Sequence, residues 1–388
     1  MGTMDTALIA AILLCSFLGS FLTLTALRKL ALSIGLVDKP DHRKHHAGAV
    51  PLVGGLAVFT GVLVGGLALT YIAEFPWYNA ALFYGSSGLL VLIGAIDDKL
   101  DLSVRARLGA QALAAVVMMF GSGAVIIELG ALLDFGAFSF GSVSMGGFGY
   151  LFTLLAVVFA INAYNMVDGI DGLIGGMAVS AFLGLGFMFA LGGHFLFWFC
   201  LLFVAVLLPY LMFNLELLGN HRRVFMGDAG SMFIGFSLIW LLARGTQGGS
   251  AAFSPVLALF FVAMPVMDMV GIMLRRVRKG QSPLRPDRDH LHHIFMRAGF
   301  DSRQTLALMT LGSFVITGIG VTMEVSGVPQ GVMLLVFLGI FAFYNFSLSH
   351  IWRILVVFRK LGLVKPLAKT HEFEAPATGV KPNLDKAA

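Results

Sequence analysis

Oxygen-bearing side chains that could hold a divalent cation recur in three short motifs of this chain. The motifs read IDDKLD, NAYNMVDGIDGL and FMGDAGS. Their candidate residues are Asp97, Asp98, Asn162, Asn165, Asp168, Asp171 and Asp228. Oxygen-only ligands of this kind favour a hard cation, Mg²⁺ or alternatively Mn²⁺, over zinc. The three motifs therefore predict a metal-dependent site.

Each motif also has a purely structural interpretation. On a continuing helix Asp97 and Asp101 would share a face, or these acids could cap the helix that follows. The asparagines and aspartates from 162 to 171 stand three apart, which predicts one helix face; they could instead make a buried polar helix contact. Asp228 could cap the next helix, or it could bridge a metal to a phosphate at that helix N-terminus.

Histidines and arginines gather in one later segment, PLRPDRDHLHHIF. Its candidate substrate-binding residues are Arg288, His290, His292 and His293. The histidines could contribute to a zinc site, but no cysteine lies near them and arginines surround them. Cationic and hydrogen-bonding groups together suit a diphosphate better. We therefore expect this segment to bind an anionic substrate, with an ordinary solvated loop as the alternative.

Two further places allow more than one interpretation. Lys44 and His45 belong to a basic stretch before PLVGG, which either anchors the chain at a membrane surface or contacts a lipid phosphate or a nucleotide. Asp268 lies within an apolar run, AMPVMDMVGIML, where a carboxylate needs a partner. The sequence does not name that partner, so Asp268 either makes a structural hydrogen bond or belongs to the site.

Long apolar stretches must position these motifs. Of the 388 residues, 58% are hydrophobic and only 12% are charged, and the mean hydropathy of +0.90 excludes an ordinary soluble domain. We expect an all-α polytopic integral membrane protein with about eleven transmembrane helices. The expected spans are 5–26, 50–72, 79–96, 107–128, 148–165, 172–191, 194–213, 231–243, 254–274, 304–323 and 330–349. A single catalytic domain would cover 1–361, followed by a disordered tail, 362–388.

The distribution of positive charge predicts the topology. All 26 lysines and arginines except Arg244 fall in connections on the same side of the expected spans. By the positive-inside rule that side is cytoplasmic, which puts the N-terminus outside, the C-terminus inside and the motifs facing the cytosol. The positive loops should contact membrane lipid headgroups; no basic and aromatic platform indicates a nucleic acid. A transporter would instead spread its acids through the membrane depth and show an internal repeat.

At these motifs the chain closely resembles the polyprenyl-phosphate N-acetylhexosamine-1-phosphate transferases. The resemblance covers about 30–350 and includes GLVDKP, PLVGG and the DRDHLHHIFMRAGFDSRQ segment, in the order of the family. It implies transfer of N-acetylglucosamine-1-phosphate from UDP-N-acetylglucosamine to undecaprenyl phosphate, with release of UMP. This reaction would be the first membrane step of O-antigen or enterobacterial common antigen synthesis, at the cytoplasmic side of a bacterial inner membrane. A different UDP-HexNAc or polyprenyl acceptor is the alternative.

The resemblance also implies roles for individual residues. Asp228 and Asn165 would hold Mg²⁺, and Asp97 and Asp98 would lie near the lipid phosphate, one of them as a base. Asp168 and Asp171, also counted as catalytic residues, would shape the nucleotide pocket and the metal environment, and the segment with Arg288, His290, His292 and His293 would bind the sugar and the phosphates. We further expect Lys44, His45 and Asn162 to bind substrate. Because a phosphomonoester is already mostly dianionic at pH 7, we expect Asp97 to position groups rather than to act as a base. A homodimer stays open as a partner.

Overall fold

The computed structural model describes residues 6–38, 48–219, 222–249, 251–282 and 290–350. Helices dominate these residues, and two short antiparallel hairpins complete them. The helices are α1 (Thr6–Ile34), α2 (Gly54–Ile72), α3 (Trp77–Leu100), α4 (Val104–Val116), α5 (Phe148–Val167), α6 (Leu173–Leu191), α7 (Leu196–Asn214), α8 (Gly227–Thr246), α9 (Leu257–Phe261), α10 (Ala263–Arg278), α11 (Leu291–Arg297), α12 (Ser302–Val325) and α13 (Gln330–Ser349). A π-helical turn, Val117–Gly121, extends α4. The strands are β1 (Val37–Asp38) with β2 (Val50–Pro51), and β3 (Glu128–Gly130) with β4 (Val143–Ser144).

An all-α membrane-spanning architecture is confirmed. Within the described residues, ten helices are long and apolar enough to cross a membrane, where about eleven were expected. The difference lies in the expected span 254–274, which is broken into α9 and α10 at Val262. Pro265 explains the break, because it has no N–H to donate to the carbonyl of Phe261 and its ring would clash there. The expected tail, 362–388, lies outside the described residues.

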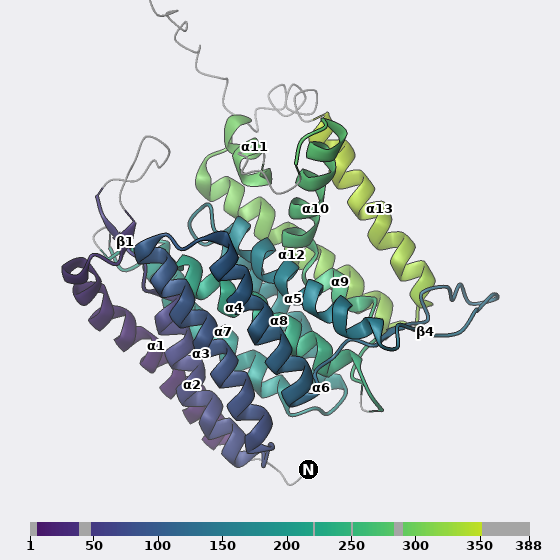
Figure 1. Cartoon of the computed structure of the whole chain (residues 1–388), viewed down its shortest axis with the longest axis horizontal. Helices are drawn as coiled ribbons and strands as arrows, with labels where there is room; N and C mark the ends of the chain where they lie inside the picture. Colours follow the sequence, from purple (N-terminus) through teal and green to yellow (C-terminus); the bar gives the residue numbers. More distant parts are fainter. Residues whose placement is uncertain (1–5, 39–47, 220–221, 250, 283–289, 351–388) are drawn as a thin grey trace, which may run out of the picture.

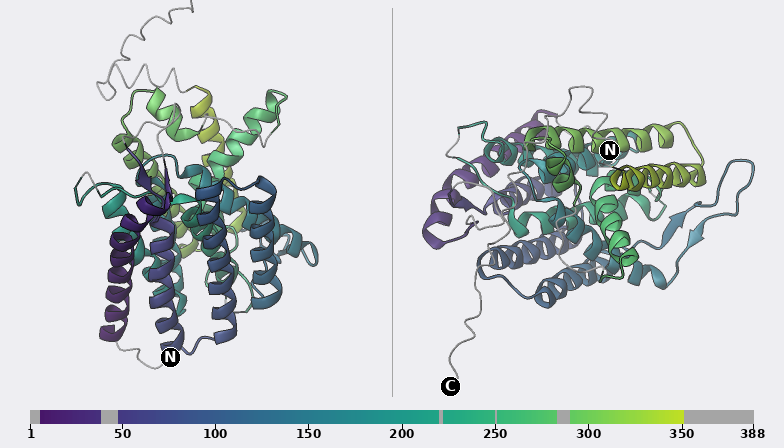
Figure 2. Two further views of the ribbon diagram at one scale, coloured as in Figure 1. Left: turned by 60° about the vertical axis from the view of Figure 1, so that its left-hand side comes forward. Right: turned by 90° about the horizontal axis from the view of Figure 1, so that it is seen from above.

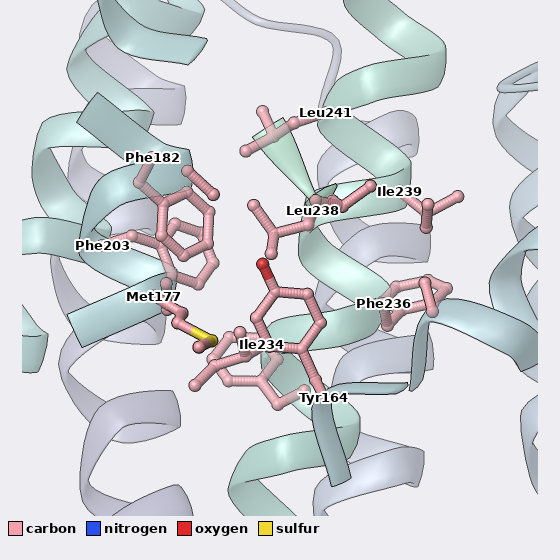
Figure 3. Packing of buried hydrophobic residues seen from close by; sticks show 14 of the residues in the cluster. Tyr164, Met177, Phe182, Phe203, Ile234, Phe236, Leu238, Ile239 and Leu241 are labelled. Carbon is pink, nitrogen blue, oxygen red and sulfur yellow. The ribbon is translucent and has the colours of Figure 1, made fainter. Parts of the chain in front are cut away.

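Helix α8 is the centre of the bundle. It begins at Gly227, earlier than the predicted 231, and 94% of its most apolar stretch of 18 residues is buried. Figure 3 shows the packing around it, with side chains from α5, α6 and α7 turned towards α8. The fully buried residues labelled there include Tyr164, Phe182, Phe203, Ile234 and Leu238. An element enclosed in this way cannot shift alone, so whatever α8 carries at its first turn is held in a fixed place.

Glycines allow α2 and α3 to approach the first turns of α8 unusually closely. A Cβ atom built on Gly55 would lie 2.1 Å from the Gly230 backbone nitrogen. A Cβ on Gly94 of α3 would lie 2.4 Å from the Ala229 Cα atom. Only residues without a side chain permit these backbone contacts. The three helices therefore converge at the end of α8 that carries Asp228.

The PLVGG segment has a structural role that its sequence did not reveal. It pairs with the residues just before α8, because Phe225 donates its N–H to the Pro51 carbonyl at 2.9 Å. In return Gly54 donates to the Phe225 carbonyl and Gly55 to the Met226 carbonyl, both at 2.9 Å. These bonds fix the entry into α8. In Figures 1 and 2 the β1 hairpin, α10 and α11 lie towards one end of the bundle, and in Figure 1 β4 lies towards the other end, beside the end of α13.

Candidate active site

Arg107 joins two of the predicted acids across three helices. Its Nη1 lies 3.0 Å from Oδ2 of Asp97 on α3 and 3.2 Å from Oδ2 of Asp228 on α8. Asp97 is buried, and its Oδ1 also accepts the Leu102 N–H at 2.7 Å. Residues 97 and 228 are far apart in the chain, yet one guanidinium of α4 contacts both. Arg107 was not among the predicted site residues.

Asn165 connects α5 to the same group. Its Nδ2 donates to Asp228 Oδ1 at 2.6 Å and to Ser231 Oγ at 3.0 Å. One turn earlier on α5, the Asn162 Nδ2 donates to Gln111 Oε1 at 2.8 Å. Gln111 in turn stands one helical turn beyond Arg107 on α4, so both α4 side chains face this cluster. Four helices, α3, α4, α5 and α8, therefore meet through polar side chains at one end of the bundle.

Asp98 binds the first turn of α8. Its Oδ1 accepts the Asp228 N–H at 2.9 Å, and its Oδ2 accepts the Ala229 N–H at 3.5 Å. The interpretation of Asp228 as the cap of its own helix is therefore wrong, because a carboxylate from α3 takes that place. Gly227 must be glycine here: its φ is +72°, and a Cβ would lie 2.4 Å from Asp98 Oδ2. The Asp228 side chain is left to face Arg107 and Asn165.

The spacing of three predicted that Asp168 and Asp171 continue the helix face of the asparagines, and this prediction is wrong. Helix α5 ends at Val167, and Gly172 takes a φ of +77° before α6 begins. Asp168 turns to α8 and accepts the Gly227 N–H. Burial, and then the negative charges of Asp228 and Asp171, raise the pKa of Asp168 to about 7. Asp171 forms an ion pair with Arg223.

Asn214, at the end of α7, supports this turn. It is buried, its Oδ1 accepts the Gly172 N–H, and its Nδ2 donates to the Val224 carbonyl at 2.8 Å. The same side chain thus ties the end of the aspartate motif to the segment that leads into α8. In the sequence, an asparagine at the end of a long apolar run was the signal that could have identified Asn214.

The histidine segment lies against the aspartate turn. His292 on α11 is buried, and a Cβ built on Gly169 would lie 2.3 Å from its Nε2. Neither ring nitrogen of His292 has a hydrogen-bond partner among the described residues. Burial, followed by the neighbouring His293 and His290, lowers the pKa of His292 to about 3, so its ring is neutral. Lys44, His45 and Arg288 lie outside the described residues.

His290 is a partner of Asp268, which could not be named from the sequence. Its Nδ1 lies 3.1 Å from Asp268 Oδ2. Asp268 Oδ1 accepts the Leu291 N–H at 3.0 Å and the Tyr344 hydroxyl at 2.8 Å. Asp268 is therefore satisfied at both oxygens by α11 and α13.

The charge balance of the cluster fits a bound cation. Five carboxylates gather in and beside it, and the described ion pairs supply two guanidiniums, Arg107 to Asp97 and Asp228 and Arg223 to Asp171. No three His, Cys, Asp or Glu side chains in the described ranges form a ready metal cage. Magnesium usually needs only one or two protein carboxylates together with water and substrate phosphates, so this donor set is compatible with it. Asn165 would have to turn its amide to present an oxygen beside Asp228.

Comparison with known proteins gives one consistent group. Residues 80–246 match the family model Glycosyl transferase family 4. The chain is 45% identical to the undecaprenyl-phosphate alpha-N-acetylglucosaminyl 1-phosphate transferase of Yersinia pestis, over 91% of this chain and 93% of that protein. The protein of the same name from Escherichia coli K12 is 45% identical over 90% and 94%, and that from Haemophilus influenzae is 42% identical over 87% and 94%.

Proposed function

The chain belongs to the family of undecaprenyl-phosphate alpha-N-acetylglucosaminyl 1-phosphate transferases, and we propose that it transfers N-acetylglucosamine-1-phosphate from UDP-N-acetylglucosamine to undecaprenyl phosphate. The second product is UMP. The observation that carries the proposal is the meeting of Asp97, Arg107, Asn165 and Asp228 from four helices at one end of the bundle. Such a site can bind two anionic reactants at the membrane surface.

The reaction exchanges one phosphorus–oxygen bond for another. An oxygen of the lipid phosphate attacks the β-phosphorus of the nucleotide sugar, and the bond from that phosphorus to the bridging oxygen breaks. UMP leaves with the electron pair of that bond. Both reactants are anionic, so charge repulsion is the main barrier. A divalent cation, when bound, would neutralise part of this charge, and Asp228 with Asn165 would hold it.

The acids of IDDKLD serve as positioning groups in this proposal. Both oxygens of Asp97 are engaged, by Arg107 and by the Leu102 N–H. Both oxygens of Asp98 accept backbone N–H groups of α8. A carboxylate with its oxygens occupied is poorly placed to take a proton. The lipid phosphate needs no strong base, because its second pKa near 6 leaves it mostly dianionic at pH 7.

The expected location follows from the chemistry of the acceptor. A long prenyl chain can remain in the bilayer while only its phosphate reaches the acids. We propose a multi-pass protein of a bacterial inner membrane with this site on the cytoplasmic side, at the first membrane step of a surface polysaccharide pathway. A homodimer stays a prediction.

The test measures UMP release by the purified protein with undecaprenyl phosphate, MgCl₂ and a panel of UDP-sugars. We expect turnover with UDP-N-acetylglucosamine and at least hundredfold loss in Asp228→Asn, because the proposed cation and Arg107 both lose their carboxylate. Asp134→Asn is the matched control, since Asp134 belongs to the segment before β4 and, among the described residues, its Oδ1 accepts only a local N–H, that of Gly136. No turnover with any UDP-HexNAc would contradict the proposal.

A further inference from the structure

Asp268 is the most deeply buried carboxylate among the described residues that the reaction above leaves without a role. Its residue is only 2% exposed, and it lies on α10 between α11 and α13. Three donors reach it from these two neighbours: the His290 ring, the Leu291 N–H and the Tyr344 hydroxyl. A carboxylate so well satisfied is kept ionised without a metal.

The element that Asp268 holds is α11, which has only seven residues. So short a helix is not stable alone, and its N-cap residue, His290, makes no capping bond with its side chain. Instead Asp268 Oδ1 accepts the N–H of its first residue, Leu291. Asp268 therefore acts as the N-cap of α11 from another helix, where a negative charge is favourable.

Helix α11 in turn reaches the aspartate turn. One residue after Leu291, the buried His292 ring lies directly against Gly169, between Asp168 and Asp171 in the chain. With both of its nitrogens unpartnered among the described residues, His292 has donor and acceptor capacity left for a ligand. A shift of α11 would therefore change the position of His292 at the edge of the site.

Asp268 also determines which nitrogen of His290 carries hydrogen. An ionised carboxylate can only accept, so the Nδ1 atom at 3.1 Å from Oδ2 must be the donor. When the ring is neutral, Nε2 is then left as the acceptor. The tautomer of His290 and the position of His292 thus depend on one acid.

We propose that Asp268, with Tyr344, is a positioning residue that presents the histidines of α11 to the donor substrate. The inference rests on the proposed function, because it assigns the histidines to the anionic nucleotide sugar. The competing explanation is that Asp268 merely joins α10 to α13, in which case α11 and substrate binding would not depend on it.

Two conservative variants separate these explanations. Tyr344→Phe removes one donor and leaves the ring in place. In Asp268→Asn the amide oxygen should still accept from the Leu291 N–H and the Tyr344 hydroxyl. The opposite orientation of the amide is unfavourable because its NH₂ group would then face these two donors. In the favoured orientation the NH₂ group faces His290 Nδ1, which must become an acceptor. Tyr84→Phe is the matched control, because it also removes a buried tyrosine hydroxyl, one that faces Thr70 on α2.

The experiment combines hydrogen exchange with steady-state kinetics on the full-length protein in detergent. We expect Tyr344→Phe to speed amide exchange in 290–298 about tenfold, as for the loss of a charge-assisted hydrogen bond, and to raise KM for UDP-N-acetylglucosamine. We expect Asp268→Asn to keep exchange near that of the wild type and still to lower kcat/KM about tenfold, with a changed pH profile. Tyr84→Phe should change none of these quantities.

The outcomes distinguish this inference from the proposed function. Wild-type exchange in Tyr344→Phe, together with wild-type kcat/KM in both variants, would overturn the positioning role while leaving the transferase proposal intact. Equal losses in Tyr344→Phe and Tyr84→Phe would also overturn it, because they would show a general effect on packing. If the wild-type protein releases no UMP, the proposed function fails, and the exchange data alone still decide whether Asp268 and Tyr344 hold α11.

Discussion

The contact between Gly55 and Gly230 gives the sharpest test of how the site is positioned, and the change to make is Gly55→Ala. The new Cβ would lie 2.1 Å from the Gly230 nitrogen, 2.4 Å from its Cα and 2.7 Å from the Ala229 carbonyl carbon. Ordinary contacts begin at 3.4 Å. The two backbones must therefore move apart by 1.3 Å, the difference between 3.4 and 2.1 Å. No side-chain rotation can relieve this overlap, because all three neighbours are backbone atoms.

The displaced segment carries Asp228, two residues before Gly230. A shift of about 1 Å would break its 2.6 Å contact with Asn165 and its 3.2 Å contact with Arg107. Misplacement of a reacting group by about 1 Å can cost about 100-fold in rate, whereas overpacking typically costs about 1–3 kcal/mol of stability. We therefore expect Gly55→Ala to fold, to unfold at a lower temperature and to lose most of its kcat.

The assay pairs thermal unfolding in detergent with UMP release at saturating substrates. Gly85→Ala on α3 is the control, because no heavy atom of the described residues lies within 4 Å of its Cβ position. It should retain full activity and gain about 0.5–1 kcal/mol of stability, the usual advantage of alanine over glycine in a helix. If folded Gly55→Ala turns over at the wild-type rate, the close backbone contact does not position the site.

Three further predictions concern charge. Arg107→Gln should lower kcat at least tenfold, because Asp97 and Asp228 would then face each other without their shared cation. Arg107→Lys should keep only part of the wild-type rate, since one ammonium cannot reproduce the planar guanidinium geometry. Full activity of Arg107→Gln would refute the role of Arg107. Without substrate, Mg²⁺ should raise the unfolding temperature of the wild type more than that of Asp228→Asn, and equal shifts would argue against a cation at Asp228. The pKa of Asp168 in the folded protein is raised to about 7, so this carboxyl contributes stability that is fully present below about pH 4 and is lost as the pH rises through 7. In metal-free buffer at pH 8, Asp168→Asn should therefore unfold at a higher temperature than the wild type, and this difference should shrink towards pH 5. A difference that does not change with pH would show that the ionisation of Asp168 is not its cause.

Helix positions were largely predictable because apolar length alone determines them. Each expected span overlaps a described helix, but several bounds differ: the first helix runs to Ile34 rather than to 26, and the helix expected to reach 128 ends at Gly121. Two further differences have a local chemical cause. Pro265 divides the ninth, and the eighth begins at Gly227 because the PLVGG segment pairs with the residues before it. That pairing joins residues about 170 positions apart, and no periodicity in either segment signals it.

The acidic residues of the site could be picked out from the sequence, but the residues that contact them could not. Isolated carboxylates at the ends of apolar runs are costly, so Asp97 and Asp228 stood out from the sequence. Arg107 did not, because topology alone already explains a cation in that connection. The stride of three misled because it assumes one continuous helix, whereas α5 ends at Val167, before Gly169 and Gly172.

The neighbours Asp97 and Asp98 show why both acids of the pair are needed even without a base. Successive helix residues point about 100° apart, so Asp97 contacts Arg107 on α4 while Asp98 contacts the first amides of α8. One turn of α3 thus fixes two other helices relative to each other, and those helices supply Arg107 and Asp228. Replacing either acid would separate groups that lie on different helices. Loss of rate in an Asp97 or Asp98 variant is therefore not evidence of proton transfer unless its pH profile also changes.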